Sequence, residues 1–310
     1  MMGMVVKSTG SWYRVRLDDG TYHQCRIKGK FRIGGLKSTN PVSVGDRVKL
    51  SLEGNDYLIN EILQRKNYII RKSVNLSKQV HIIASNIDQA FLIVTLVSPF
   101  TSTGFIDRFL VTAEAYQVPT IIVFNKVDLY DEFDRKYHDE VVNMYSEAGY
   151  ECIDVSALNQ QNISVLTGRM KDNVTLLSGH SGVGKSTLVN AIDPNLDLIT
   201  QQVSDAHQKG MHTTTFAEMF ELDFGGFIID TPGIKGLGLV EIEDSELSDY
   251  FKEIRLLKGQ CKFHNCKHVN EPQCAVKNAL DAGKIHPVRY DSYLSMLEDD
   301  GNQYRESKYH

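Results

Sequence analysis

The pattern of hydrophobic and polar positions divides the chain into three parts. Over residues 1–72, apolar and polar residues alternate in short runs, at 12–17 and 21–27, and turn-forming residues follow at 18–20. Further short runs at 47–50 and 57–59 flank a Gly-Asn-Asp turn. Several short strands at this spacing predict a small β-barrel.

From about residue 75 the pattern changes to alternating strands and helices. The runs 90–97 and 120–124 are almost wholly apolar, which is typical of buried parallel strands. Shorter runs predict strands at 152–155, 174–177 and 227–229, and apolar residues at helical spacing predict helices near 106–113 and 137–148. This alternation predicts a doubly wound α/β domain. Beyond about residue 238 the pattern becomes helical and polar. We therefore expect a multidomain α/β protein with boundaries at 1–72, 73–237 and 238–310.

The segment 179–186 reads Gly-His-Ser-Gly-Val-Gly-Lys-Ser and fits the phosphate-binding P-loop motif. A predicted strand precedes it and a predicted helix follows, as the motif requires. Backbone N–H groups of such a loop point at phosphate oxygens, Lys185 adds a positive charge, and the Ser186 hydroxyl is a ligand for Mg²⁺. The predicted phosphate-binding residues are Gly179, His180, Ser181, Gly182, Val183, Gly184, Lys185, Ser186 and Thr187.

Two loops point to guanine as the base. Asn125-Lys126-Val127-Asp128 follows the buried strand at 120–124. The Asp128 carboxylate can accept two hydrogen bonds from guanine, a donor pair that adenine lacks. Asn125 can brace the loop, and the Lys126 stem can cover the ring. Ser156-Ala157 follows another strand and matches the second guanine loop of GTPases.

The remaining motifs concern Mg²⁺ and the γ-phosphate. Asp230-Thr231-Pro232-Gly233 follows a strand, so Asp230 is expected to hold Mg²⁺ and the Gly233 N–H to meet the γ-phosphate. The run His212-Thr213-Thr214-Thr215 is a candidate switch, in which Thr214 or Thr215 closes over Mg²⁺; both remain open. A plain strand start is the alternative for this run.

The order of these motifs is permuted. GTPases usually run from the P-loop through the threonine switch and Asp-x-x-Gly to the guanine loops, whereas here the guanine loops come first. Because all these loops lie at one edge of a doubly wound sheet, moving the chain ends leaves the site intact. We therefore predict a circularly permuted GTPase that binds GTP and GDP.

Three cysteines crowd into fourteen residues near the C-terminus, with His268 between them. Cys261, Cys266, His268 and Cys274 supply a full tetrahedral set, with no position left for water, so the cluster predicts one structural Zn²⁺ site. Three buried thiols beside a surface histidine are the alternative.

The net charge of −5 hides an asymmetry. Residues 1–75 hold 14 Lys and Arg against 6 Asp and Glu, whereas the remainder is acidic. A basic barrel on an acidic body favours a polyanionic partner, although a solvated basic surface is the plain alternative. The N-terminus has no signal-peptide pattern, and no run is long enough to span a bilayer. We therefore expect a cytoplasmic monomer with no membrane partner.

The permuted motifs, the threonine switch and the cysteine segment at 261–276 resemble the RsgA (YjeQ) family of small-ribosomal-subunit biogenesis GTPases. The segments 28–32 and 41–48 are similar to that family's N-terminal OB-fold. The resemblance covers nearly the whole chain. It implies an OB-fold barrel, a permuted GTPase domain and a zinc domain, and GTP hydrolysis stimulated by the small ribosomal subunit and its rRNA late in maturation. Met211 and Lys28 depart from the family, which usually has arginine at both positions.

The motif set lacks the glutamine that usually positions the attacking water. Ile234 stands where many GTPases carry a glutamine that orients the attacking water. We expect His212 to position that water, with Lys185, Asp230 and Gly233 completing the catalytic set; packing or an RNA contact is the alternative for His212. An RNA-binding scaffold with structural GTP and a signalling switch are competing functions, and an ATPase fits Asp128 poorly.

Overall fold

The computed structural model describes residues 1–28, 41–72, 80–196, 217–230 and 242–298. Its N-terminal part is a closed barrel of five strands, β1 (Met2–Ser8), β2 (Tyr13–Leu17), β3 (Tyr22–Ile27), β4 (Arg47–Glu53) and β5 (Asp56–Ile62). The strands pair in the order β1-β2-β3-β5-β4, and β4 pairs again with β1. The expected OB-fold is confirmed, since closure of this order leaves no free edge in the barrel.

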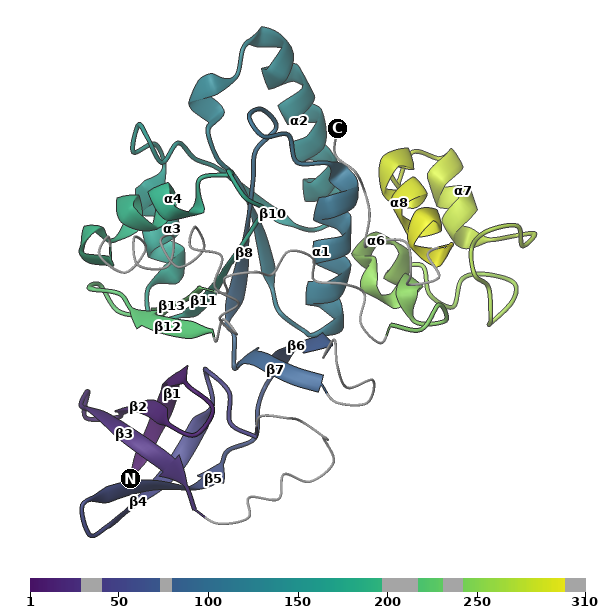
Figure 1. Ribbon diagram of the computed structural model, residues 1–310. Helices are drawn as coiled ribbons and strands as arrows, with labels where there is room; N and C mark the ends of the chain where they lie inside the picture. Colours follow the sequence, from purple (N-terminus) through teal and green to yellow (C-terminus); the bar gives the residue numbers. More distant parts are fainter. Residues whose placement is uncertain (29–40, 73–79, 197–216, 231–241, 299–310) are drawn as a thin grey trace.

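The α/β domain carries five parallel strands and one antiparallel strand in the order β10-β9-β8-β11-β13-β12. Helices α1 and α2 lie on one side of this sheet, and α3 and α4 on the other, which confirms the doubly wound architecture (Figure 1). The strands are β8 (Gln89–Val94), β9 (Thr120–Phe124), β10 (Glu151–Asp154), β11 (Val174–Ser178), β12 (Glu218–Glu221) and β13 (Phe227–Asp230). The helices are α1 (Thr103–Ala115), α2 (Glu132–Glu147), α3 (Ile163–Met170) and α4 (Lys185–Ile192).

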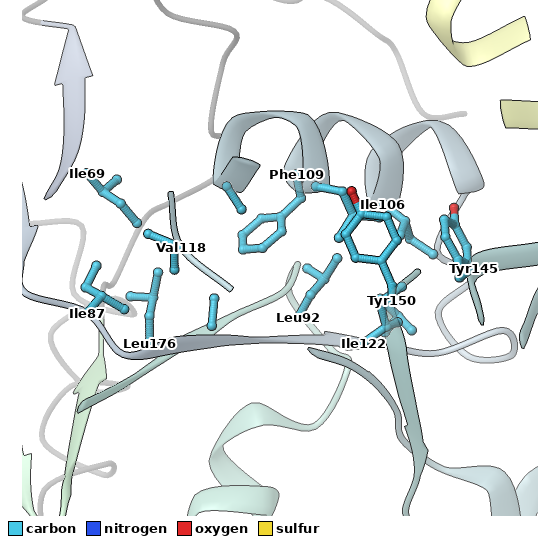
Figure 2. Close-up of a cluster of buried hydrophobic side chains, with 14 of the residues drawn as sticks. Ile69, Ile87, Leu92, Ile106, Phe109, Val118, Ile122, Tyr145, Tyr150 and Leu176 are labelled. Atoms are coloured by element: carbon cyan, nitrogen blue, oxygen red, sulfur yellow. The ribbon is translucent and has the colours of Figure 1, made fainter. Parts of the chain in front are cut away.

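Alternate residues of the central strands point to opposite faces of the sheet and pack into two separate hydrophobic cores. Leu92 and Ile122 pack with Ile106 and Phe109 of α1 on one side of the sheet, as Figure 2 shows. Phe91 and the residues that alternate with Leu92 and Ile122 pack against α3 and α4 on the other side. Because both faces are covered, the strands read as continuous apolar runs.

A short ribbon, β6 (Tyr68–Lys72) and β7 (Val80–Ser85), lies between the barrel and the α/β domain (Figure 1). The bridge between Val44 and Ala84 ties the barrel to this ribbon. The barrel also joins the main sheet directly, because β1 pairs with β12 at Lys7 and Glu218.

The C-terminal part is helical, with α6 (Lys252–Arg255), α7 (Ala275–Asp281) and α8 (Pro287–Leu297), and it packs beside α1 (Figure 1). Its apolar core includes Val111 of α1. Beneath this contact the Arg289 guanidinium donates to Asp107 on α1 at 2.6 Å and to Glu253 on α6 at 2.7 Å. The contact between α1 and the C-terminal helices is therefore polar as well as apolar.

Several predicted elements differ from the structure in their limits. The strand expected at 90–97 ends at Val94, because the chain turns at Thr95–Thr101 through a cis Ser98–Pro99 bond. The helix expected near 137–148 already begins at Glu132. The domain boundaries at 72/73 and 237/238 fall at or within segments outside the described residues and stay predictions. Across the described part of the chain, every helix is too short or too polar to cross a bilayer.

Candidate functional site

The P-loop runs between the end of β11 at Ser178 and the start of α4 at Lys185. Gly179, Gly182 and Gly184 have φ angles of 146°, 86° and 91°, which L-residues with side chains seldom adopt. A Cβ at Gly179 would lie 2.4 Å from the carbonyl oxygen of Ile93. The loop can therefore follow this course only with glycine at these positions.

The Lys185 ammonium lies over the loop. Its Nζ donates to the carbonyl oxygens of Gly179 at 2.7 Å and His180 at 2.8 Å. Ser186 and Thr187 follow in the first turn of α4, and both are exposed. The loop therefore presents a lysine and two hydroxyls at the N-terminal end of a helix, an arrangement suited to an anion with a bound metal ion.

Asn125 joins the P-loop to both predicted guanine loops. Its buried side chain donates from Nδ2 to the carbonyl oxygen of Val183 at 2.9 Å. Its Oδ1 accepts from the N–H of Ala157 at 3.2 Å. Three motifs that lie far apart in the sequence therefore converge on one amide.

Lys126 and Asp128 follow Asn125 with their side chains at the surface of the same loop. Lys126 adopts a left-handed conformation, and its Nζ donates to the carbonyl oxygens of Gly182 at 2.8 Å and Ser98 at 2.7 Å. Asp128 lies in the 3-10 turn Val127–Leu129 and is partly exposed. Within the described residues its carboxylate makes no hydrogen bond, so both oxygens can accept from a ligand.

Ser156 shapes the second guanine loop from inside. It is fully buried, and its Oγ accepts from the N–H of Asn159 at 3.1 Å. The backbones of Ser156 and Gln161 exchange two hydrogen bonds, at 3.3 and 3.0 Å. These contacts hold Ala157 where its N–H meets Asn125.

The loop Thr95–Thr101 is a part of the site that sequence reasoning missed. Thr101 Oγ1 lies 2.7 Å from His180 Nε2, and Pro99 would lie 3.3 Å from a Cβ on Gly182. The Ser98–Pro99 pair, a common turn signal, could have located this loop. The loop supports the P-loop from the end of β8.

The magnesium and switch residues are only partly placed. Asp230 ends β13, and its backbone is the register partner of Leu177 on β11, one strand from the P-loop. The other predicted residues of this group, His212, Thr214, Thr215 and Gly233, lie outside the described residues.

The four predicted zinc ligands come together. The ligand atoms of Cys261, Cys266, His268 and Cys274 all lie within 4.8 Å of one another. Zn–S bonds of about 2.3 Å place two thiolates of a tetrahedron about 3.8 Å apart. The Sγ atoms of Cys261 and Cys274 are 3.9 Å apart, and each lies within 3.5 Å of His268 Nδ1. Burial lowers the pKa of His268, which favours the neutral, metal-binding imidazole. The cluster therefore fits a closed zinc site.

Comparison with known proteins decides the family. The family described as RsgA GTPase matches residues 62–240, and the RsgA N-terminal domain matches residues 2–57. The chain belongs to the RsgA family. An RsgA from Christiangramia forsetii, called a small ribosomal subunit biogenesis GTPase, is 55% identical and is matched over 100% of this chain and 99% of its own length. The RsgA of Bacteroides fragilis is 54% identical over 96% of this chain and 97% of its own.

Two solved structures of RsgA relatives share the fold. YjeQ from Thermotoga maritima superposes with a TM-score of 0.79 at 37% identity, and covers 96% of both chains. YloQ, described as a circularly permuted GTPase, gives a TM-score of 0.78 at 31% identity, covering 99% of this chain and 96% of its own. The RsgA assignment, the permuted GTPase fold and GTPase activity predicted from the sequence are thus confirmed.

Proposed function

We propose that this GTPase binds the small ribosomal subunit and hydrolyses GTP to GDP and phosphate during late subunit maturation, with turnover stimulated by the subunit. The observation that carries the nucleotide assignment is Asn125, which holds the P-loop and both guanine loops together through its amide. The relatives' names supply the small subunit as the partner.

The residue roles follow the motifs. Asp128 binds guanine, braced by Asn125 and Ser156, while the stem of Lys126 covers the base. Lys185 and the N–H groups of the P-loop bind the phosphates. Ser186 and Asp230 would hold Mg²⁺, which would supply positive charge to neutralise the phosphates. The Gly233 N–H meets the γ-phosphate, either Thr214 or Thr215 closes over the Mg²⁺ site, and His212 positions the attacking water.

The barrel is the proposed rRNA contact. Its surface pairs arginines with aromatic rings: the Arg26 guanidinium lies 3.8 Å from the centroid of Trp12, and Arg14 lies 4.6 Å from that of Tyr22. Cations beside exposed rings suit a polymer of phosphates and stackable bases. The C-terminal cluster holds one structural Zn²⁺ in this proposal, and the protein acts as a cytoplasmic monomer.

The first test measures GTP turnover by the purified protein with and without small ribosomal subunits. A rise of at least about tenfold with subunits is expected, because a partner that orders catalytic groups can remove several kcal/mol from the barrier. A Lys185→Ala variant should lose turnover under both conditions. Tight GDP binding with no response to subunits would instead favour a guanine-nucleotide switch with another partner.

A second test addresses His212. His212→Ala should bind GTP normally but lose about 100-fold or more of its subunit-stimulated turnover, since a group that positions water acts in the transition state. The nearby Met211→Leu is the matched control and should keep its rate. Full stimulated turnover by His212→Ala would remove the histidine from the mechanism.

A further inference from the structure

His138 of α2 lies behind the guanine loops and belongs to none of the motifs described above. Its side chain is only 9% exposed. Its ring is nearly perpendicular to that of Phe124, with an interplanar angle of 84° and centroids 5.1 Å apart, and its Nε2 lies 2.8 Å from Asp154 Oδ1. The imidazole thus contacts the last residue of β9 and the last residue of β10 at once.

These two contacts lie directly below the base-binding residues. Phe124 and Asp154 are register partners, and Asn125 and Ser156 follow them by one and two positions. The N–H of Val155 donates to the carbonyl oxygen of Phe124 at 2.8 Å, and the N–H of Val127 donates to that of Val155 at 3.3 Å. Movement of Asp154 would therefore displace its neighbour Val155. Because Val155 hydrogen-bonds to Phe124 and Val127, both guanine loops would move with it.

The groups around His138 favour the protonated form of its imidazole ring. Its Nδ1 lies 3.2 Å from Asp139 Oδ1, so each ring nitrogen faces a carboxylate, and only the protonated ring can donate to both. Burial lowers the pKa of His138, but the hydrogen bonds and charges of Asp154 and Asp139 outweigh burial, and the pKa is raised.

Other titratable groups around the ring do not reverse this preference. The Tyr130 ring lies 5.3 Å away and its pKa is raised by burial, which keeps the phenol neutral. Asp134, one turn earlier on α2, adds negative charge and accepts from the N–H of Asp131 in the capping box. Asp154 is the stronger of the two direct partners, since Asp139 is 74% exposed.

We propose that His138 is a positioning residue for the guanine loops, and that its protonated form holds them in the arrangement that binds GDP and GTP. This rests on the proposed assignment of Asn125, Asp128 and Ser156 to guanine. When the ring loses its proton, one of the two contacts loses its donor and the ring loses its charge. The hold on Asp154 weakens, and nucleotide affinity falls as pH rises through the titration of the histidine.

The test is equilibrium binding of a fluorescent GDP to the full-length protein with Mg²⁺, between about pH 6 and 8, where histidine titrates. Affinity should fall about threefold to tenfold over this range, the loss expected when a charge-assisted hydrogen bond becomes a neutral one. His138→Gln should flatten the profile, because glutamine keeps a donor but does not titrate. Titration of the GDP phosphate contributes equally to every variant and cancels in the comparison.

Two further variants separate positioning from simple packing. Asp154→Asn keeps the shape of the partner and removes its charge, so it should also flatten the profile, whereas Asp139→Asn should change it little. His23→Gln, on the barrel, is the matched control and should keep the wild-type slope. A wild-type slope in His138→Gln and Asp154→Asn would overturn the proposal. Failure of every variant and the wild type to bind GDP at any pH would overturn the guanine assignment itself.

Discussion

At the scale of single residues, Arg289 is a charged group buried between two carboxylates. It is 1% exposed and lies between Asp107, which is fully buried, and Glu253. Burial raises the pKa of Asp107, while Arg289 and the Tyr145 hydroxyl lower it. Tyr145 donates to the same Asp107 oxygen at 2.9 Å. Removing the arginine would leave two carboxylates in an apolar interface without their cation.

Arg289→Met should therefore lower the free energy of unfolding by about 3–5 kcal/mol, the loss typical of breaking a buried ion pair from one side. Urea denaturation followed by circular dichroism measures it. Lys258→Met is the matched control. Lys258 contacts Asp249 at 2.6 Å but is 69% exposed, so its loss should stay below about 1 kcal/mol. If both variants lose the same small amount of unfolding free energy, the Arg289 ion pairs stabilise the fold no more than a surface ion pair does.

At the scale of elements, the glycines of the P-loop determine how the loop meets its neighbours. A Cβ at Gly184 would lie 2.5 Å from Asn125 Nδ2, at a φ of 91°. Gly184→Ala should weaken GDP binding about tenfold or more, since it adds backbone strain and displaces the amide that joins the three loops. Gly104→Ala in α1 is the control, because nothing lies within 4 Å of that Cβ. It should leave binding unchanged and stabilise the fold by about 0.4–1 kcal/mol.

Strands that are buried on both faces were predicted well from the sequence. Elements whose limits depend on a bulge or a helix cap were predicted less well. The strand at 120–124 matches its prediction, because a run buried on both faces is apolar throughout. Strand β1 was missed, because a bulge between Val5 and Lys7 interrupts the alternation and places both Val5 and Val6 in cores. The start of α2 was missed because its first turn packs on no core, its Phe133 being 79% exposed, and is defined by a capping box.

The same distinction holds for the site. Motifs predicted the P-loop, the guanine loops and the zinc cluster, because each needs particular residue types at fixed spacing. They could not show that Asn125 joins Val183 to Ala157, or that Thr101 lies against His180. Those contacts depend on which strands become neighbours in the sheet.

At the scale of the whole molecule, the barrel and the α/β domain form one continuous sheet. Besides the β1–β12 pairing, Lys7 contacts Glu218 at 2.8 Å and Arg16 contacts Glu221 at 2.6 Å. Tyr22 donates to the same Glu221 carboxylate. Strand β12 pairs with β13, which ends at Asp230. Paired strands therefore connect the barrel to Asp230, at the edge of the proposed nucleotide site.

The C-terminal domain packs on α1 of this body, and its helix α8 also contacts the predicted zinc cluster. The hydroxyl of Tyr290 donates to the carbonyl oxygen of His268 at 2.6 Å, and that of Tyr293 to the carbonyl oxygen of Lys267 at 2.8 Å. Helix α8 therefore holds the ligand loop, and through Arg289 it also holds α1. Loss of the metal should loosen both contacts together.

Chelation of the metal should consequently destabilise the whole chain and not the C-terminal domain alone. We expect a loss of about 3 kcal/mol or more, since binding of a structural metal contributes directly to folding. Hydrogen exchange should rise in α8 and also along the face of α1 around Asp107. Cys266→Ser should cause the same loss of stability and the same rise in hydrogen exchange without chelator. Cys152→Ala, on β10, removes a thiol outside the cluster and should leave the response to chelator intact. If melting and exchange are unchanged by chelator and the purified protein carries no zinc, the thiols pack without a metal, and the contact between α1 and the C-terminal helices does not depend on the cluster.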